Sequence, residues 1–237
     1  MKKTFTSALC MFFLCALAAQ KDGDLIVTEI SSGYWMHTSY KMLGDAPFPS
    51  NGMIAEVSGG VLIVDTGWGK KPTRKLLRWV RRHLHKPVKG LIVSHSHDDR
   101  SGGIALFAKK GIPLFMSERS ARLLREQGEK LPDYTALPDE STQLGAEVFY
   151  PGSGHTSDNI VVYFEEPRIL FGGCFVKSRD AKGLGNIADA DLKAWPLSLQ
   201  AVQRRFPDAK IVVPGHQSAG GTDLLIHTLQ LLETNGK

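Results

Sequence analysis

Residues 91–103 read LIVSHSHDDRSGG, an apolar run followed at once by side chains of the kinds that bind metal ions. The run predicts a buried strand. His95 and His97 are two positions apart and Asp99 follows two further on, so in a loop their side chains can converge on one point. A helix would scatter them, because positions i and i+2 lie about 200° apart around its axis. A polar turn with two chance histidines is the alternative, but H-x-H-x-D directly after a buried strand favours metal ligands.

The composition is ordinary for a globular protein. The chain has 237 residues, of which 42% are hydrophobic and 22% charged, enough for one α/β domain with a full core. Disordered and multi-span membrane proteins are thereby excluded. The formal net charge is +5, and Lys and Arg gather on only one helix face, so we expect no nucleic-acid partner.

The first residues have the features of a secretory signal peptide. Lys2 and Lys3 form a basic start, and residues 8–17 are apolar but too few to span a bilayer. We expect residues 1–18 to be a signal peptide that is cleaved between about positions 18 and 20, leaving residues 19–237 as the mature domain. The mature protein would then be periplasmic, without stable membrane association.

The chain contains three cysteines, Cys10, Cys15 and Cys174. Neither of the first two follows a convincing lipobox, so we expect no lipid anchor, and both leave with the signal peptide. The mature chain then has one thiol in an oxidising compartment and cannot form an internal disulfide. Cys174 is either a small buried residue or a thiolate held by a metal ion.

Hydrophobic periodicity predicts strands that alternate with helices, as in a layered α/β domain. The strands are predicted at residues 25–30, 34–38, 53–57, 61–65, 91–93, 112–116, 146–150, 160–164, 168–171 and 211–216. The helices are predicted at residues 72–84, 101–110, 118–127, 196–206 and 222–234, with Ser117 as the N-cap of the third. Residues 133–145 predict an irregular polar connection, and residues 182–190 a glycine-rich loop.

Residues 40–50 contain Gly44, Pro47 and Pro49 among apolar side chains, and they show neither helical nor strand periodicity. They predict either a mobile hairpin loop with apolar tips or a plain connection whose apolar residues fold back on the core. Both alternatives remain open at this point.

Three more metal-type side chains stand at predicted strand ends beside glycines. His155 lies in a glycine-rich turn, and Cys174 and His216 each follow an apolar strand. Layered α/β proteins place their sites at the edge of the sheet where the strands end. Chance would place one or two metal-binding side chains at such positions, whereas this sequence places six. The sequence therefore predicts a metal centre built from His95, His97, His155, Asp99, Cys174 and His216.

This donor set favours zinc, because imidazole and thiolate suit that ion while a carboxylate leaves the site able to hold water. Six ligands are more than one tetrahedral zinc ion can bind, so we expect two zinc ions. The two expected ligand sets are His95, His97 and His155 for one ion and Asp99, Cys174 and His216 for the other. Such a pair would lower the pKa of a shared water toward neutrality and make hydroxide the nucleophile.

Five motifs together carry a resemblance to a known family. They are His95-Ser-His-Asp-Asp99-Arg100, Gly154-His155-Thr, Gly173-Cys174-Phe-Val-Lys177, Gly185-Asn186 and Pro214-Gly-His216. From about residue 25 to the C-terminus the chain resembles a class B β-lactamase, subclass B1, of the metallo-β-lactamase superfamily. Relatives that cleave thioesters, lactones or phosphoesters typically carry a further histidine and an acidic bridging ligand where this chain has Arg100 and Cys174. Subclass B2 would replace His95 by Asn, and subclass B3 would lack the cysteine ligand.

The resemblance implies a single-domain α/β fold, a four-layer αβ/βα sandwich with the two-zinc site at one edge. It also implies hydrolysis of the β-lactam amide of penicillins, cephalosporins or carbapenems by a zinc-bound hydroxide, and hence antibiotic resistance. The substrates would be small molecules, and we expect a monomer.

Asp99, Lys177 and Asn186 are the catalytic residues that the resemblance implies. Lys177 would pair with the substrate carboxylate, and Asn186 would help the first zinc to stabilise the oxyanion. From spacing alone Lys177 is an exposed loop lysine, and a Gly-Asn turn needs no substrate. Residues 40–50 resemble a flap over the substrate, and Asp65 would orient a metal ligand.

Two alternative functions remain open. The chain could be another zinc hydrolase of the same superfamily, such as a lactonase or thioesterase. It could also be a periplasmic zinc-binding protein without catalytic activity.

Overall fold

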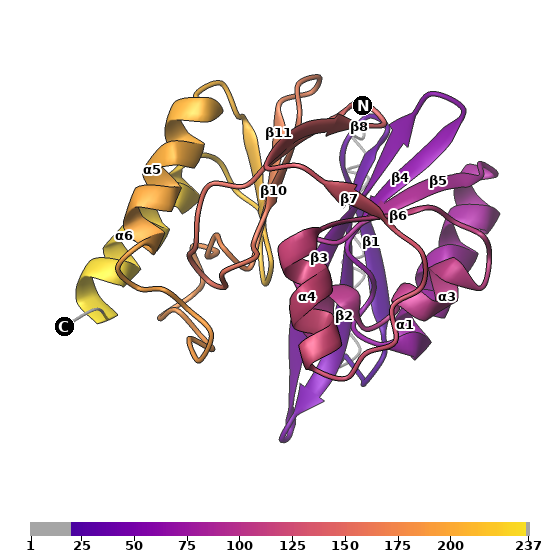
Figure 1. Ribbon diagram of the computed structural model, residues 1–237, viewed down its shortest axis with the longest axis horizontal. Coiled ribbons are helices and arrows are strands. Elements are labelled where there is room, and N and C mark those ends of the chain that lie inside the picture. Colours follow the sequence, from indigo (N-terminus) through magenta and orange to yellow (C-terminus); the bar gives the residue numbers. More distant parts are fainter. Residues whose placement is uncertain (1–19, 236–237) are drawn as a thin grey trace, which may run out of the picture.

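Two β-sheets lie face to face between two groups of helices (Figure 1). The computed structural model describes residues 20–235, so the signal peptide expected at residues 1–18 lies outside the described part. The larger sheet contains β1 to β7 in sequence order, and the smaller sheet has the order β12-β11-β10-β9-β8. The expected four-layer α/β sandwich is confirmed.

The bounds of the elements are as follows. The strands are β1 (Leu25–Ser31), β2 (Tyr34–Leu43), β3 (Ala46–Val57), β4 (Gly60–Val64), β5 (Val88–Ile92), β6 (Leu114–Ser117), β7 (Thr135–Leu137), β8 (Glu140–Gln143), β9 (Ala146–Phe149), β10 (Val161–Phe164), β11 (Ile169–Gly173) and β12 (Ile211–Pro214). The helices are α1 (Lys70–Trp79), the π-helical turn η1 (Val80–Leu84), α2 (Asp98–Ser101), α3 (Ile104–Ala108), α4 (Glu118–Glu126), α5 (Trp195–Arg205) and α6 (Asp223–Asn235). Among residues 20–235, no helix has the length and apolar character needed to cross a membrane.

The larger sheet starts as an antiparallel meander and becomes parallel where helices intervene. β1 to β4 pair antiparallel through short turns, whereas β4 to β7 pair parallel. The parallel connections contain α1 with η1, then α2 and α3, then α4. In the smaller sheet β11 and β12 pair parallel, and α5 lies in the connection between them. The carboxyl ends of β5, β11 and β12 are thereby left to support loops.

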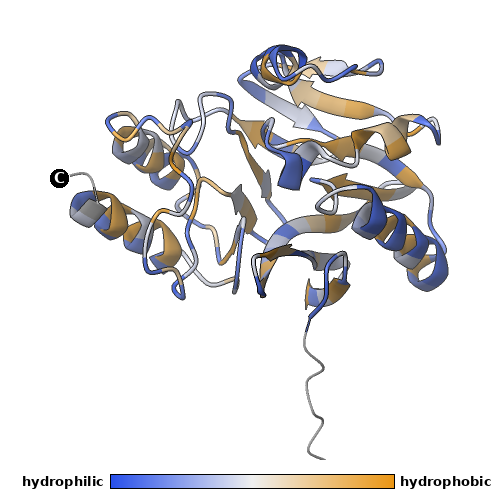
Figure 2. Ribbon diagram, turned by 90° about the horizontal axis from the view of Figure 1, so that it is seen from below, coloured by the Kyte–Doolittle hydropathy of each residue, from blue (hydrophilic) through white to orange (hydrophobic). Residues whose placement is uncertain are grey.

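Three apolar layers hold the sandwich together. β4 is buried on both faces, because Leu62 and Val64 pack between the sheets while Val61 and Ile63 pack beneath the helices. The helices on the larger sheet contribute Leu76, Phe107 and Leu124 to the second layer. The helices on the smaller sheet contribute Trp195, Leu199 and Leu225 to the third. In Figure 2 the helices carry hydrophilic colour on their outward sides and hydrophobic colour toward the sheets.

Residues 40–43 and 46–50 belong to the paired strands β2 and β3, joined by a turn at Gly44 and Asp45, so the expected hairpin is present as a regular ladder and not as a loop. β2 and β3 pair without interruption as far as Leu43 and Ala46. β3 pairs with β4 only from Met53 onward, so its first half has no neighbouring strand of its own sheet on that side, and only single contacts such as Asn51 N–H to the carbonyl of Gly215 at 2.8 Å are made there. Pro47 and Pro49 are tolerated there, because an edge strand does not need every N–H for a ladder bond.

Two further expectations are corrected. In place of the single helix expected at residues 101–110, the chain forms two short helices, α2 and α3, which Gly102 and Gly103 separate. The first of them, α2, begins at Asp98 and therefore includes Asp99. The expected irregular connection at residues 133–145 contains the short strands β7 and β8. Both strands are polar or exposed over much of their length, so periodicity gave no sign of them.

The central strand β5 supplies a test of the core. Leu91 is fully buried beneath the helices, so Leu91→Ala should lower the free energy of unfolding by about 2–5 kcal/mol through lost contacts and a cavity. Leu197→Ala is the matched control, since Leu197 is 65% exposed and its truncation should change stability by less than about 0.5 kcal/mol. Urea unfolding monitored by circular dichroism measures both; equal effects would contradict the layer assignment.

Candidate metal centre

The six metal-type side chains come from the ends of strands in both sheets. His95 and His97 follow β5, and Asp99 lies in α2. The other three come from the smaller sheet, where His155 stands between β9 and β10, Cys174 directly follows β11, and His216 follows β12. Facing sheets therefore bring residues more than a hundred positions apart to one edge of the sandwich.

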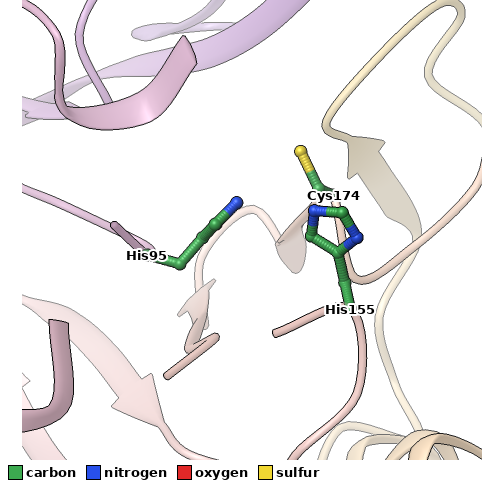
Figure 3. Close-up of side chains that lie close together, drawn as sticks. All are labelled: His95, His155 and Cys174. Atoms are coloured by element: carbon green, nitrogen blue, oxygen red, sulfur yellow. The ribbon is translucent and has the colours of Figure 1, made fainter. Parts of the chain in front are cut away.

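The donor atoms of these residues form overlapping groups within 4.8 Å of one another. The three groups are His95 with His97 and Asp99, His95 with His155 and Cys174, and Asp99 with Cys174 and His216. Nδ1 of His97 lies 3.3 Å from Nε2 of His155, and the sulfur of Cys174 lies 3.2 Å from Nε2 of His216. Figure 3 shows the ring of His95 reaching toward His155 and Cys174. All six side chains thus meet around one small space.

The contacts within this cluster suit cations. Nε2 of His95 and Nδ1 of His155 are buried, and neither has a hydrogen-bond partner among residues 20–235. Burial and, secondarily, nearby positive groups lower the pKa of both imidazoles well below the usual value, which keeps them neutral. Neutral imidazoles with unpaired nitrogens, a carboxylate and a thiol form a donor set that fits zinc.

Asp99, Cys174 and His216 have pKa values that are shifted in different directions. Burial would raise the pKa of Asp99, but Arg100 and the surrounding imidazoles outweigh it and bring the pKa to about 2. Burial raises the pKa of the Cys174 thiol to about 12 and lowers that of His216 to about 4. A metal ion at Cys174 would therefore displace the thiol proton on binding.

Arg100 holds Asp99 in place. Its guanidinium is fully buried and lies 2.7 Å from Oδ2 of Asp99 and 3.5 Å from Oδ2 of Asp65. It also donates to the carbonyl of Asn51 in β3 and, at 2.7 Å, to that of Gly215 after β12. A buried planar donor with several acceptors leaves the Asp99 carboxylate little freedom to turn.

Asp65 reaches a metal-type ligand through Ser94. The backbone N–H and the hydroxyl of Ser94 donate to Asp65 at 2.7 and 2.8 Å, and the same hydroxyl lies 3.1 Å from Nδ1 of His95. Burial raises the pKa of Asp65 to about 7 against the opposing effect of Arg100. Ser94 was not singled out from the sequence, although its position directly before His95 was a usable signal.

Two other contacts were not foreseen either. Nε2 of His97 lies 3.0 Å from a carboxylate oxygen of Asp189, in the glycine-rich loop, and Nδ1 of His216 lies 2.6 Å from the carbonyl of Pro49. Each contact orients a ring whose other nitrogen faces the cluster. Neither partner is near its histidine in the sequence, so no local motif could have indicated the pairs.

The cluster opens into a cleft of about 530 Å³ that Lys177 and Asn186 also line. Lys177 is only 7% exposed, unlike the exposed loop lysine that spacing alone suggested, and its ammonium lies 5.2 Å from the centre of the Trp195 ring. Burial lowers the pKa of Lys177. Among residues 20–235 no carboxylate forms an ion pair with it. Asn186 is exposed, and its side-chain oxygen accepts a hydrogen bond from the N–H of Ala188 at 3.1 Å.

The hairpin of β2 and β3 forms an apolar wall of the same cleft. Leu43 and Phe48 line it together with Trp68. The Phe48 ring lies 6.4 Å from that of Trp68 and 4.9 Å from that of His216, measured between centroids. The segment expected to act as a flap thus borders the cluster.

Comparisons with known proteins agree with the motifs. A family model described as the metallo-beta-lactamase superfamily matches residues 45–216. The metallo-beta-lactamase type 2 of Bacillus sp. (strain 170) is 38% identical over 216 residues, which cover 89% of this chain and 83% of that protein. The solved metallo-beta-lactamase from Pontibacter korlensis is 47% identical with a TM-score of 0.85, over 90% of this chain and 100% of that one. FIM-1 from Pseudomonas aeruginosa, solved in the mono-zinc form, is 36% identical with a TM-score of 0.85, over 91% of this chain and 97% of that one. The resemblance is confirmed: this chain belongs to the metallo-beta-lactamase superfamily.

Proposed function

We propose that this chain is a zinc-dependent β-lactamase that hydrolyses the amide bond of β-lactam antibiotics and thereby gives resistance to them. The observation that carries the proposal is the meeting of six metal-type side chains at the base of one open cleft. The Bacillus relative is named a metallo-beta-lactamase, which supports the same reaction for this chain. Penicillins, cephalosporins and carbapenems are the proposed substrates.

The proposed cofactor is a pair of zinc ions. The ligand sets are His95, His97 and His155 for one ion and Asp99, Cys174 and His216 for the other. The second set is one of the three close donor groups, and the first is supported by the approach of His97 to His155 and by the unpaired nitrogen of His95. The mono-zinc form of FIM-1 supports zinc as the metal. When bound, zinc acts as a Lewis acid and lowers the pKa of a coordinated water.

The protein's own residues bind and orient the substrate. We assign to Lys177 the binding of the substrate carboxylate, since its buried ammonium lines the cleft and is in no ion pair within residues 20–235. The amide N–H groups of Asn186 can donate to the carbonyl oxygen of the scissile bond as negative charge develops there. Asp99, kept ionised and oriented by Arg100, supplies the carboxylate of the second ligand set.

The apolar wall of the cleft accounts for the remaining contacts with substrate. Phe48 and Trp68 face the same space as the metal-type cluster. They would cover the apolar parts of a bicyclic ring system and keep bulk water from the reacting bond. A cleft of about 530 Å³ lies within the size range of small-molecule sites.

We further propose that the chain is exported and works as a monomer in the periplasm. The basic start and short apolar stretch of residues 1–18 support export by a cleaved signal peptide.

Purified protein supplied with zinc should open the ring of nitrocefin and of at least one carbapenem. A chelator should abolish the activity and added zinc should restore it, because the donor set needs its cations to activate water. Elemental analysis should find two zinc ions per chain. Hydrolysis of a lactone or thioester without β-lactam cleavage would favour the other hydrolases, and zinc binding without any hydrolysis would favour a binding protein.

Ser94→Ala should lower zinc affinity by about 10- to 100-fold, because it removes the hydroxyl that links Asp65 to His95. Titration of the protein against a chromophoric chelator measures this. Ser58→Ala, in the exposed turn between β3 and β4, is the matched control and should leave the affinity unchanged. Unaltered zinc binding by S94A would contradict the orienting role of the Asp65–Ser94 pair.

Lys177→Gln should raise KM for β-lactams by about 10- to 100-fold with little change in kcat, because a hydrogen bond to a charged group contributes about 1.5–3 kcal/mol to ground state and transition state alike. Lys193→Gln, at an exposed lysine outside the cleft, is the control. Steady-state kinetics separate the two constants. A fall in kcat alone would assign Lys177 to the chemical step instead of to binding.

A further inference from the structure

Positive charge is concentrated in one stretch of the chain. Residues 66–97 contain nine Lys and Arg and no Asp or Glu, whereas the rest of the chain carries 20 Lys and Arg against 24 Asp and Glu. Seven of the nine lie in α1 and η1, on the outer face of the larger sheet at the right-hand side of Figure 1. One surface is therefore strongly basic although the net charge is modest.

Several of these cations are not neutralised by neighbours. Lys75 pairs with Asp24 at 3.1 Å, and Lys86 pairs with Glu56 at 2.6 Å. By contrast, no ion pair within residues 20–235 involves the four exposed arginines. These are Arg74, Arg78, Arg81 and Arg82.

A groove of about 490 Å³ runs along this row, and its rim and floor differ in character. The exposed residues Arg74, Arg78 and Arg81 form the rim, together with exposed Lys110, which lies two residues after α3. Half-buried Val88, Leu106 and Ile112 form part of the floor. No acidic side chain of the described residues lines the groove.

We propose that this basic groove, defined by the four rim residues above, docks the protein on an anionic lipid bilayer. Phosphate headgroups would pair with the arginines, which bind phosphate through two parallel N–H groups, while the apolar floor accommodates the adjoining hydrocarbon. Each Lys or Arg near such a surface strengthens binding by roughly fivefold. Four cations without acidic neighbours are enough for reversible association.

The aromatic side chain on this face argues against single-stranded nucleic acid as the partner. Binding of unpaired bases uses aromatic rings with an open face. Trp79 is half-buried, and its ring is stacked on that of His83 with centroids 4.7 Å apart. The groove therefore offers cations and an apolar floor but lacks a free stacking platform within the described residues.

The docking face is separate from the metal centre. The groove shares no lining residue with the cleft, so a bound bilayer would leave the cleft open. The proposal therefore does not depend on the proposed function, and zinc content and nitrocefin hydrolysis can be measured on the same variants.

Co-sedimentation with vesicles tests the proposal. The exported form expected from the sequence, residues 19–237, and its variants are mixed with vesicles of phosphatidylglycerol and phosphatidylcholine, or of phosphatidylcholine alone, at about 0.1 M salt. We expect binding only to the anionic vesicles and its loss in 1 M salt, where charges are screened within about 3 Å. The triple variant Arg74→Gln, Arg78→Gln, Arg81→Gln should bind roughly 100-fold more weakly, at about fivefold for each charge removed.

Two control variants make the result specific. The triple Lys variant at positions 74, 78 and 81 keeps the charge and should retain most of the binding. A triple Gln variant of the exposed Lys193, Arg204 and Lys210, at the other end of the molecule, loses the same net charge and should bind like the parent. All variants share one N-terminus, so its contribution cancels. Equal loss in both Gln variants, no binding of the parent to anionic vesicles, or tighter binding of DNA than of vesicles would overturn the proposal.

Discussion

The buried guanidinium of Arg100 connects the two sheets at the edge where the metal-type ligands meet. It bonds to the carbonyl of Asn51 in the larger sheet, to that of Gly215 after the smaller sheet, and to the carboxylate of Asp99. Removing one partner of a buried ion pair of this kind lowers the free energy of unfolding by about 3–5 kcal/mol, because the remaining charge is left uncompensated. The position of the two sheets and the position of Asp99 therefore depend on the same group.

The cluster combines one strong anion with neutral donors. Asp99 stays ionised through its contact with Arg100, whereas burial lowers the pKa of His95, His155 and His216 and raises that of the Cys174 thiol. Cation binding in such a site is linked to release of the thiol proton, so affinity for the metal rises with pH. The network around the ligands, through Ser94, Asp189 and Pro49, orients rings that would otherwise be free to turn.

The metal-type cluster and the concentrated positive charge lie on different surfaces of the molecule. The cleft has an apolar wall, a buried Lys177 and a metal-type cluster, and it lies between the two sheets. The cations of α1 and η1 lie on the outer face of the larger sheet, where the helix turns its apolar stripe inward and leaves its arginines outside. The same amphipathic pattern that stabilises the sandwich thus creates the basic face.

How much was predictable depends on the range of the interactions. The sequence alone predicted the alternation of strands with long helices and the six metal-type side chains, since each prediction depends on local periodicity or on a polar residue near the end of an apolar strand. The four-layer sandwich was implied by the resemblance to the family. Only the tertiary structure decided that residues 40–50 continue a β-ladder, that Asp99 lies in a helical turn and that β7 and β8 are strands. It alone also decided that Lys177 is buried and that Ser94 connects Asp65 to His95. These features depend on pairing and packing between segments far apart in the chain, and such partners leave no periodic pattern in either segment.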